Sequence, residues 1–77
     1  MKYKHLFSLV KKIHKELTDR EKEYARKNIK HRLREDWGYA FYTGKLVAYT
    51  YVLHEEGYSF KTEKALASRL LSLGIQP

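Results

Sequence analysis

The first seventeen residues restrict the fold most, because their apolar side chains recur at the spacing of an α-helix. Every third or fourth position is apolar, at Tyr3, Leu6, Val10, Ile13 and Leu17, and lysines fill many of the positions between them. This spacing puts the apolar residues on one side of a helix, whereas a strand would alternate them. We therefore predict an amphipathic helix over residues 3–17 that needs other elements to cover its stripe.

A second helix is predicted over residues 18–36, with almost no loop before it. Thr18 and Glu21 have the spacing of a capping box, in which the threonine side chain accepts from the Glu21 amide and the Glu21 carboxylate reaches back. A narrow apolar stripe follows at Ala25, Ile29 and Leu33. The other positions are charged or polar, so we expect this helix to lie on the surface.

Residues 39–53 are compatible with either a helix or a β-hairpin. Their many aromatic and β-branched residues favour strands, and Thr43-Gly44 offers a turn. A heptad-like stripe of large residues, however, runs through Tyr39, Tyr42, Leu46, Tyr49 and Leu53. A second stripe consists of small residues, at Ala40, Gly44 and Ala48, and would let another helix approach closely. We predict a helix that ends near Gly57 and keep the hairpin over 39–53, which would make the fold α+β, as the alternative.

The last segment is predicted to form a helix from a Thr62 cap to Leu73. Leucines at 66, 70 and 73 form its stripe, and Gly74-Ile75 has the pattern of a helix stop with a hydrophobic contact onto the last turn. The resulting fold class is all-α: one domain over residues 1–77, built as a compact bundle of about four short helices. A domain of this size has a small stability margin, which association with another copy would increase.

The charge is concentrated in the first half of the chain. The net charge is +7; residues 1–36 contain 12 basic and 6 acidic side chains, whereas residues 37–77 contain 4 and 3. This asymmetry points to nucleic acid or another acidic partner. The chain has no cysteine, and its most apolar run, 37–53, is shorter than the ~20 residues of a membrane span. We expect a soluble, cytoplasmic protein that does not use the membrane.

The candidate binding site is one face of the predicted second helix. Helical spacing aligns Arg20, Tyr24, Lys27, His31 and Arg34, and Lys30 lies at the margin. Cations suit phosphates, and an aromatic ring among them suits a base, so these six residues are predicted to contact nucleic acid. Basic side chains four residues apart also repel each other along this helix, which is unfavourable unless a partner compensates for their charge.

Two other interpretations of these charges remain open. Acidic residues early and basic residues late in a helix are what its dipole favours, so the face could simply be solvated. The basic face could also press against an acidic protein surface. A helix-turn-helix, with residues 62–73 as the reading helix, is a further alternative. Its groove-facing side chains would include Lys64 and Arg69.

The remaining features predict binding without catalysis. Tyr51 lies off both stripes of its segment, which makes it the candidate for an exposed protein-interface residue. No catalytic set, metal-ligand spacing or phosphate loop is present in the sequence, so we expect no enzyme activity, metal or cofactor. We therefore predict a small basic protein that contacts nucleic acid. The alternatives are an adaptor or inhibitor of a larger enzyme, of the kind encoded by phages and mobile elements, and a self-associating homodimer.

Overall fold

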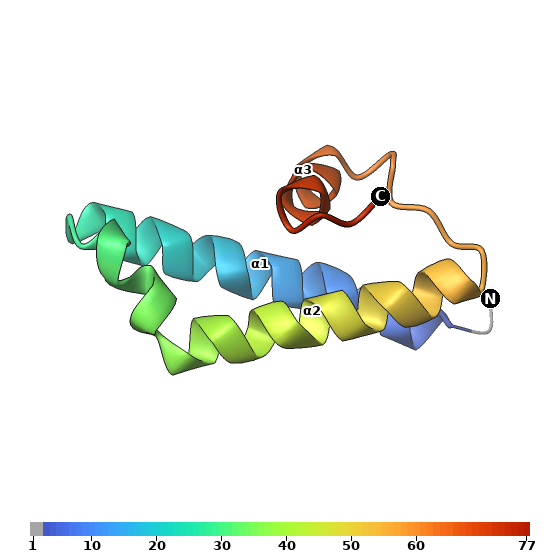
Figure 1. Ribbon diagram of the computed structural model, residues 1–77, viewed down its shortest axis with the longest axis horizontal. Coiled ribbons are helices and arrows are strands. Elements are labelled where there is room, and N and C mark those ends of the chain that lie inside the picture. The colour runs from blue at the N-terminus through green and yellow to red at the C-terminus, as the bar shows by residue number, and fades with distance from the viewer. Residues whose placement is uncertain (1–2) are drawn as a thin grey trace.

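The computed structural model describes residues 3–77, and all of its regular secondary structure is helical (Figure 1). Its elements in chain order are α1 (Lys4–Arg26), the 3-10 helix η1 (Lys30–Glu35), α2 (Trp37–Glu55) and α3 (Lys64–Ser72). The described residues contain no strand, which confirms the all-α prediction of about four helices. The hairpin alternative is wrong, because residues 39–53 lie within α2.

The predicted boundary between residues 17 and 18 is wrong, because α1 continues through Thr18 to Arg26. The Thr18 hydroxyl does not cap a new helix; it donates to the His14 carbonyl one turn earlier, at 3.0 Å. The carboxylate of Glu21, the other half of the predicted capping box, instead accepts from Arg69 of α3. Thr18 and Glu21 therefore lie within a longer helix, where Thr18 bonds to the preceding turn and Glu21 bonds to α3.

Helix α1 ends at Arg26, and Asn28, two residues later, has a φ of 58° in the left-handed region. The Ile29 amide donates to the Tyr24 carbonyl and the Asn28 amide to the Ala25 carbonyl, at 2.9 and 3.0 Å. This pair of bonds is a Schellman motif, which satisfies the last carbonyls of a helix. The predicted helix over 18–36 is consequently divided between the end of α1 and η1.

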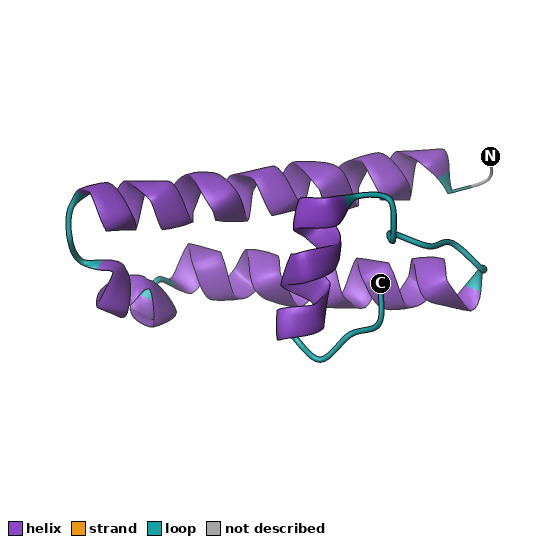
Figure 2. Cartoon of the chain, turned by 90° about the horizontal axis from the view of Figure 1, so that it is seen from above, coloured by secondary structure: helices purple, strands orange, loops and turns teal. Residues whose placement is uncertain are grey.

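Asp36 starts α2 by accepting a hydrogen bond from the Tyr39 amide at 2.7 Å, the usual role of an N-cap aspartate. Helix α2 then runs antiparallel to α1 along its length (Figure 1). Helix α3 crosses both of them on one side of the pair, as Figure 2 shows from above. The molecule is elongated, with extents of 40 × 19 × 17 Å.

The core lies where the three α-helices meet. Its fully or almost fully buried members are Val10, Ile13, Leu17, Leu46, Leu53, Phe60, Leu66 and Leu70. Burying a leucine or phenylalanine side chain contributes about 1.5–3 kcal/mol, so this cluster supplies much of the driving force for folding. The stripes predicted from spacing in α1 and α2 thus form the core.

Glycines end α2 and α3 as predicted. Gly57 and Gly74 have φ values of 86° and 80°, and the following residue in each case donates back to the helix. Ile75 also packs against the core, which is the predicted hydrophobic contact.

Helix α3 begins at Lys64, two residues after the predicted Thr62 cap, and has no side-chain cap. No helix in the described part of the chain is long and apolar enough to cross a membrane.

Candidate interaction surfaces

Two of the six predicted nucleic-acid contacts instead hold the corner between α1 and α2. Arg20 donates to Asp36 at 3.1 Å and to Glu16 at 3.0 Å, and the Tyr24 hydroxyl donates to the other Asp36 oxygen at 2.5 Å. The hydrogen bond from Tyr24 lowers the pKa of Asp36, and the same bond raises the pKa of Tyr24. Arg20 and Tyr24 are therefore engaged within the fold.

Lys27 lies at the end of α1 and forms an ion pair with Glu23 at 3.2 Å. Glu23 also accepts from Arg26, and this contact is the first cause of its lowered pKa. Both cations are well exposed, so the pairs are weak, as surface ion pairs usually are. Lys27 remains accessible to a partner, although one carboxylate already offsets part of its charge.

The other predicted contacts, Lys30, His31 and Arg34, lie on η1 with Arg32, and we call these four residues the basic tip. All four are exposed. Within residues 3–77, only Arg32 of this group forms an ion pair, with Glu35 at 3.7 Å. The six predicted residues thus do not form one helical face. Three are spread along the second half of α1 and at its end, and three are gathered on η1.

The side of α2 turned away from the core is exposed and almost free of charge. This outer face of α2 consists of Trp37, Ala40, Phe41, Gly44, Val47, Ala48, Tyr51 and Val52. Trp37 is 77% exposed and Tyr51 is 66% exposed, which confirms the predicted exposure of Tyr51. The Trp37 ring stacks on Phe41 at 5.1 Å between centroids, and the Lys45 ammonium lies 4.7 Å from the Phe41 centroid.

The sequence interpretation missed this face, except for Tyr51. The available signal was the composition of α2, which is apolar all round rather than along one stripe. Such a helix is normally covered on every side. Here the core covers one side only.

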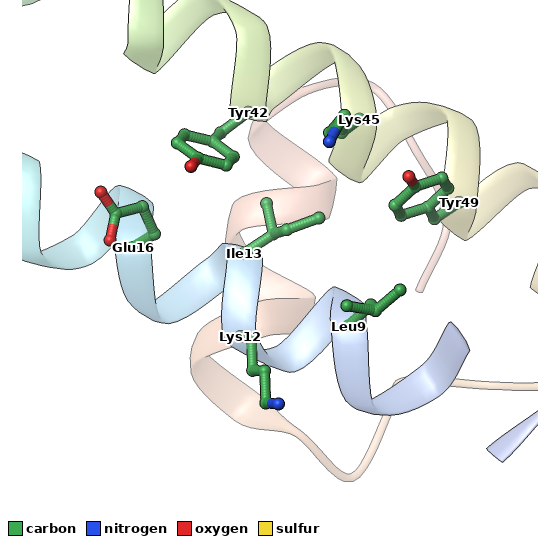
Figure 3. Close-up of a pocket in the computed structure, with 7 residues that line it drawn as sticks. All are labelled: Leu9, Lys12, Ile13, Glu16, Tyr42, Lys45 and Tyr49. Carbon is green, nitrogen blue, oxygen red and sulfur yellow. The ribbon is translucent and has the colours of Figure 1, made fainter. Parts of the chain in front are cut away.

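A shallow groove of about 340 Å³ lies between α1 and α2 (Figure 3). Leu9 and Ile13 contribute apolar side chains from α1, and Tyr42 and Tyr49 contribute aromatic ones from α2. The remaining lining residues are Lys12, Glu16 and Lys45. A hollow of this size is at the small end of ligand sites. Its charged groups are of both signs and come from its rim, so they define no particular ligand.

Arg69 of α3 is the centre of a polar cluster that the sequence interpretation did not predict. Its Nε donates to His14 Nδ1 at 2.9 Å, and its two terminal nitrogens donate to Glu21 at 2.6 and 2.8 Å. The bonds between Arg69 and Glu21 raise the pKa of Arg69 and lower the pKa of Glu21. Tyr39 of α2 also donates to Glu21, at 2.5 Å. In the helix-turn-helix alternative Arg69 would face a groove, and this prediction is wrong because the side chain points into the bundle.

Metal binding finds no support in the geometry. No group of three or more histidine, aspartate or glutamate side chains within residues 3–77 is arranged to hold a metal ion. The clustered titratable groups, His14, Glu21 and Asp36, instead join one helix to another or cap one.

No protein-family profile matches this chain, and neither a curated protein nor a solved structure does. The candidate contact surfaces among the described residues are the basic tip, the outer face of α2 and the groove between α1 and α2.

Proposed function

We propose that this chain is a small, non-enzymatic binding protein whose main contact surface is the outer face of α2, and that it binds another protein there. The observation that carries the proposal is the exposure of Trp37 and Tyr51 on one uncharged helix face. Tryptophan and tyrosine are enriched among the residues that dominate protein–protein binding energies.

Isolated exposed apolar residues are common and need no explanation. The outer face differs because its members form one patch from Trp37 to Val52, a length of about 23 Å at 1.5 Å per residue. Glu55, at its C-terminal end, is the one acidic residue among the exposed positions of α2, and no exposed position of that helix carries a lysine or arginine. A face selected only for solubility would carry charges, as the outward side of α1 does.

Burial of this face would be favourable. Covering a fully exposed aromatic side chain yields about 1.5–3 kcal/mol from the hydrophobic effect. Trp37 and Tyr51 can each contribute most of this free energy on binding, because most of each side chain is exposed to solvent. Partner binding would therefore gain several kcal/mol from two side chains alone.

Affinity capture from a nuclease-treated lysate at high salt tests the proposal. The bait carrying Trp37→Arg and Tyr51→Arg should lose a stoichiometric partner that the unaltered chain retains. A matched bait carrying Lys12→Ala and Lys22→Ala, which alters exposed residues of α1, should keep it. Equal recovery on all three baits would contradict the assignment of this surface.

Nucleic-acid binding at the basic tip is the second candidate. The observation in its favour is that Lys30, His31 and Arg34 are exposed and form no ion pair within residues 3–77. Arg32 shares the same short helix, and Trp37 follows it two residues after Glu35, with the ring face turned away from Phe41 available for stacking on a base. This footprint is smaller than the predicted one, because Arg20 and Tyr24 are engaged with Asp36.

Salt dependence distinguishes this candidate. If four phosphates are contacted, the affinity for a single strand should fall roughly 50-fold as salt rises from about 50 to about 200 mM. Lys30→Glu with Arg34→Glu should abolish binding to a single-stranded DNA or RNA oligonucleotide. Lys12→Glu with Lys22→Glu, an equal change in net charge on α1, should weaken binding much less. A dissociation constant that does not change with salt concentration would reject nucleic acid as the partner.

A further inference from the structure

We propose that the protein bound by the outer face of α2 is a second copy of this chain, packed antiparallel across a two-fold axis at Gly44. This inference rests on the proposed function, because it names the partner of the same surface. It is carried by the symmetry of the exposed residues about Gly44 and by the charges at the two ends of α2.

Six exposed residues of α2 form three pairs of similar character at equal distances before and after Gly44, whereas Val52 has no such counterpart. Seven positions away are two aromatic residues, Trp37 and Tyr51. Four positions away are two alanines, Ala40 and Ala48, and three positions away are two bulky apolar residues, Phe41 and Val47. An antiparallel two-fold axis at Gly44 brings each of these residues to the same level along the helix as its counterpart on the other copy, which is the self-complementarity that a symmetric dimer needs.

The shapes also complement each other in this register. At 100° per residue, Phe41 and Ala48 lie on one side of the face and Val47 and Ala40 on the other. Phe41 therefore lies beside Ala48 of the partner subunit, and Val47 beside Ala40 of the partner subunit. Each bulky side chain meets a small one.

Gly44 allows the two helices to approach closely at the axis. A Cβ built on Gly44 meets no atom within 4 Å, so the position is open toward solvent. Glycine at a helix crossing permits an interaxial distance near the short end of the usual range of about 8–10 Å. The absence of a side chain at this one position is otherwise unfavourable inside a helix.

The charges at the ends of α2 favour an antiparallel pair. The basic tip precedes the N-terminus of α2, whereas Glu55 and Glu56 lie at its C-terminus. Antiparallel packing brings the acidic end of one copy toward the basic tip of the other. Parallel packing would place the two basic tips side by side, which costs free energy through repulsion.

The area available sets the expected strength. The exposed parts of Trp37, Phe41 and Tyr51 amount to roughly 370 Å² per copy if each aromatic side chain presents about 200 Å². With the smaller residues of the face, the total for two copies approaches the lower limit of about 1,200 Å² for stable complexes. We therefore expect a dissociation constant in the micromolar range.

Sedimentation equilibrium provides the first test. The mass of the unaltered chain should rise from 9.2 kDa toward twice that value across micromolar concentrations. Gly44→Leu should keep the helical circular dichroism signal and remain monomeric over that range, because the added side chain enters open space in one copy and obstructs the axis in the pair. Ser68→Leu, which adds apolar bulk at an exposed position of α3, should dimerise like the unaltered chain.

Engineered cysteines test the register, since the chain has none of its own. In the proposed dimer the two Gly44 α-carbons lie about 4–5 Å apart, so Gly44→Cys should form an intermolecular disulfide on mild oxidation. Tyr51→Cys alone should not, because its two copies are separated by about 21 Å along the axis. A mixture of Trp37→Cys and Tyr51→Cys chains should cross-link into the mixed dimer.

Each result supports or overturns the dimer separately from the proposed function. Cross-linking of Tyr51→Cys to itself would show a parallel pair and overturn the antiparallel register. A monomer at all concentrations, with no Gly44→Cys disulfide, would overturn the dimer. In that case capture of a different protein, lost on Gly44→Leu, would still support α2 as a binding surface. If the chain neither dimerises nor captures a different protein through α2, the outer face of α2 is not a binding surface.

Discussion

Arg69 of α3 and Glu21 of α1 form a two-point ion pair in which both terminal guanidinium nitrogens donate to the two carboxylate oxygens, at 2.6 and 2.8 Å. The Arg69 side chain is only 13% exposed. Because Tyr39 of α2 donates to the same carboxylate, this pair joins all three α-helices at one point. It fixes how the short α3 lies across the longer pair and thereby supports the inner side of α2.

Removing Arg69 should destabilise the bundle clearly. Arg69→Ala leaves the Glu21 carboxylate partly buried without its cation, and hydrogen bonds to charged groups contribute about 1.5–3 kcal/mol. We expect the free energy of unfolding to fall by about 2 kcal/mol and Tm by about 10 °C for a domain of this size. Urea denaturation followed by circular dichroism measures the change. Lys64→Ala, at an exposed position of the same helix, is the control and should alter stability by less than about 0.5 kcal/mol.

Stability should fall on mild acidification because of His14. Burial lowers the pKa of His14, and the neighbouring Arg69 cation lowers it further, while Glu21 partly opposes them. The unfolded chain, with a histidine pKa near 6.5, then binds the proton more readily than the folded one. The contribution of His14 to the free energy of unfolding is therefore present above about pH 6.5 and is lost as the pH falls below that value.

The comparison that isolates this effect is between the unaltered chain and His14→Gln, whose amide oxygen can still accept from Arg69 but does not titrate. Denaturation midpoints measured from about pH 7.5 to pH 5 should fall more steeply for the unaltered chain. Parallel pH profiles for the two proteins would show that His14 does not contribute.

Replacing Thr50 with valine should stabilise the protein. Thr50 is fully buried, and its hydroxyl has no hydrogen-bond partner among the described residues. Valine has nearly the same shape without the unpaired polar atom, so the free energy of unfolding should rise by about 1 kcal/mol. Thr43→Val in the same helix is the matched control. It should give no gain, because the Thr43 hydroxyl already donates to the Tyr39 carbonyl at 2.8 Å.

The parts of the fold that depend on periodicity were predictable from the sequence. Leu46 and Leu53 are buried as their spacing indicated, and Gly57 and Gly74 end helices because each adopts a positive φ. These features are local: a helix has one repeat, and glycine alone enters the left-handed region without cost. The same information identified residues 39–53 as helical against their strand propensity.

The errors arose where distant residues decide the outcome. Thr18 and Glu21 have a valid capping pattern, but Arg69, 48 residues after Glu21, takes the carboxylate. The continuous helix predicted over 18–36 was wrong for a different reason, since Asn28 adopts a left-handed conformation and separates Lys30 from α1. Asparagine often ends helices in this way, so the sequence does contain a signal for this break at Asn28.

The most direct test of the central claim, that the outer face of α2 is a contact surface, uses Trp37. It is the only tryptophan and is 77% exposed, so its fluorescence reports on this face without a label. Emission and acrylamide quenching should be measured from about 1 to about 500 μM protein, a range that spans the expected dissociation constant. The account predicts a blue shift and reduced quenching as concentration rises, both absent in Gly44→Leu. Emission and quenching that stay constant for the unaltered chain, both across this range and in the presence of any captured partner, would contradict it.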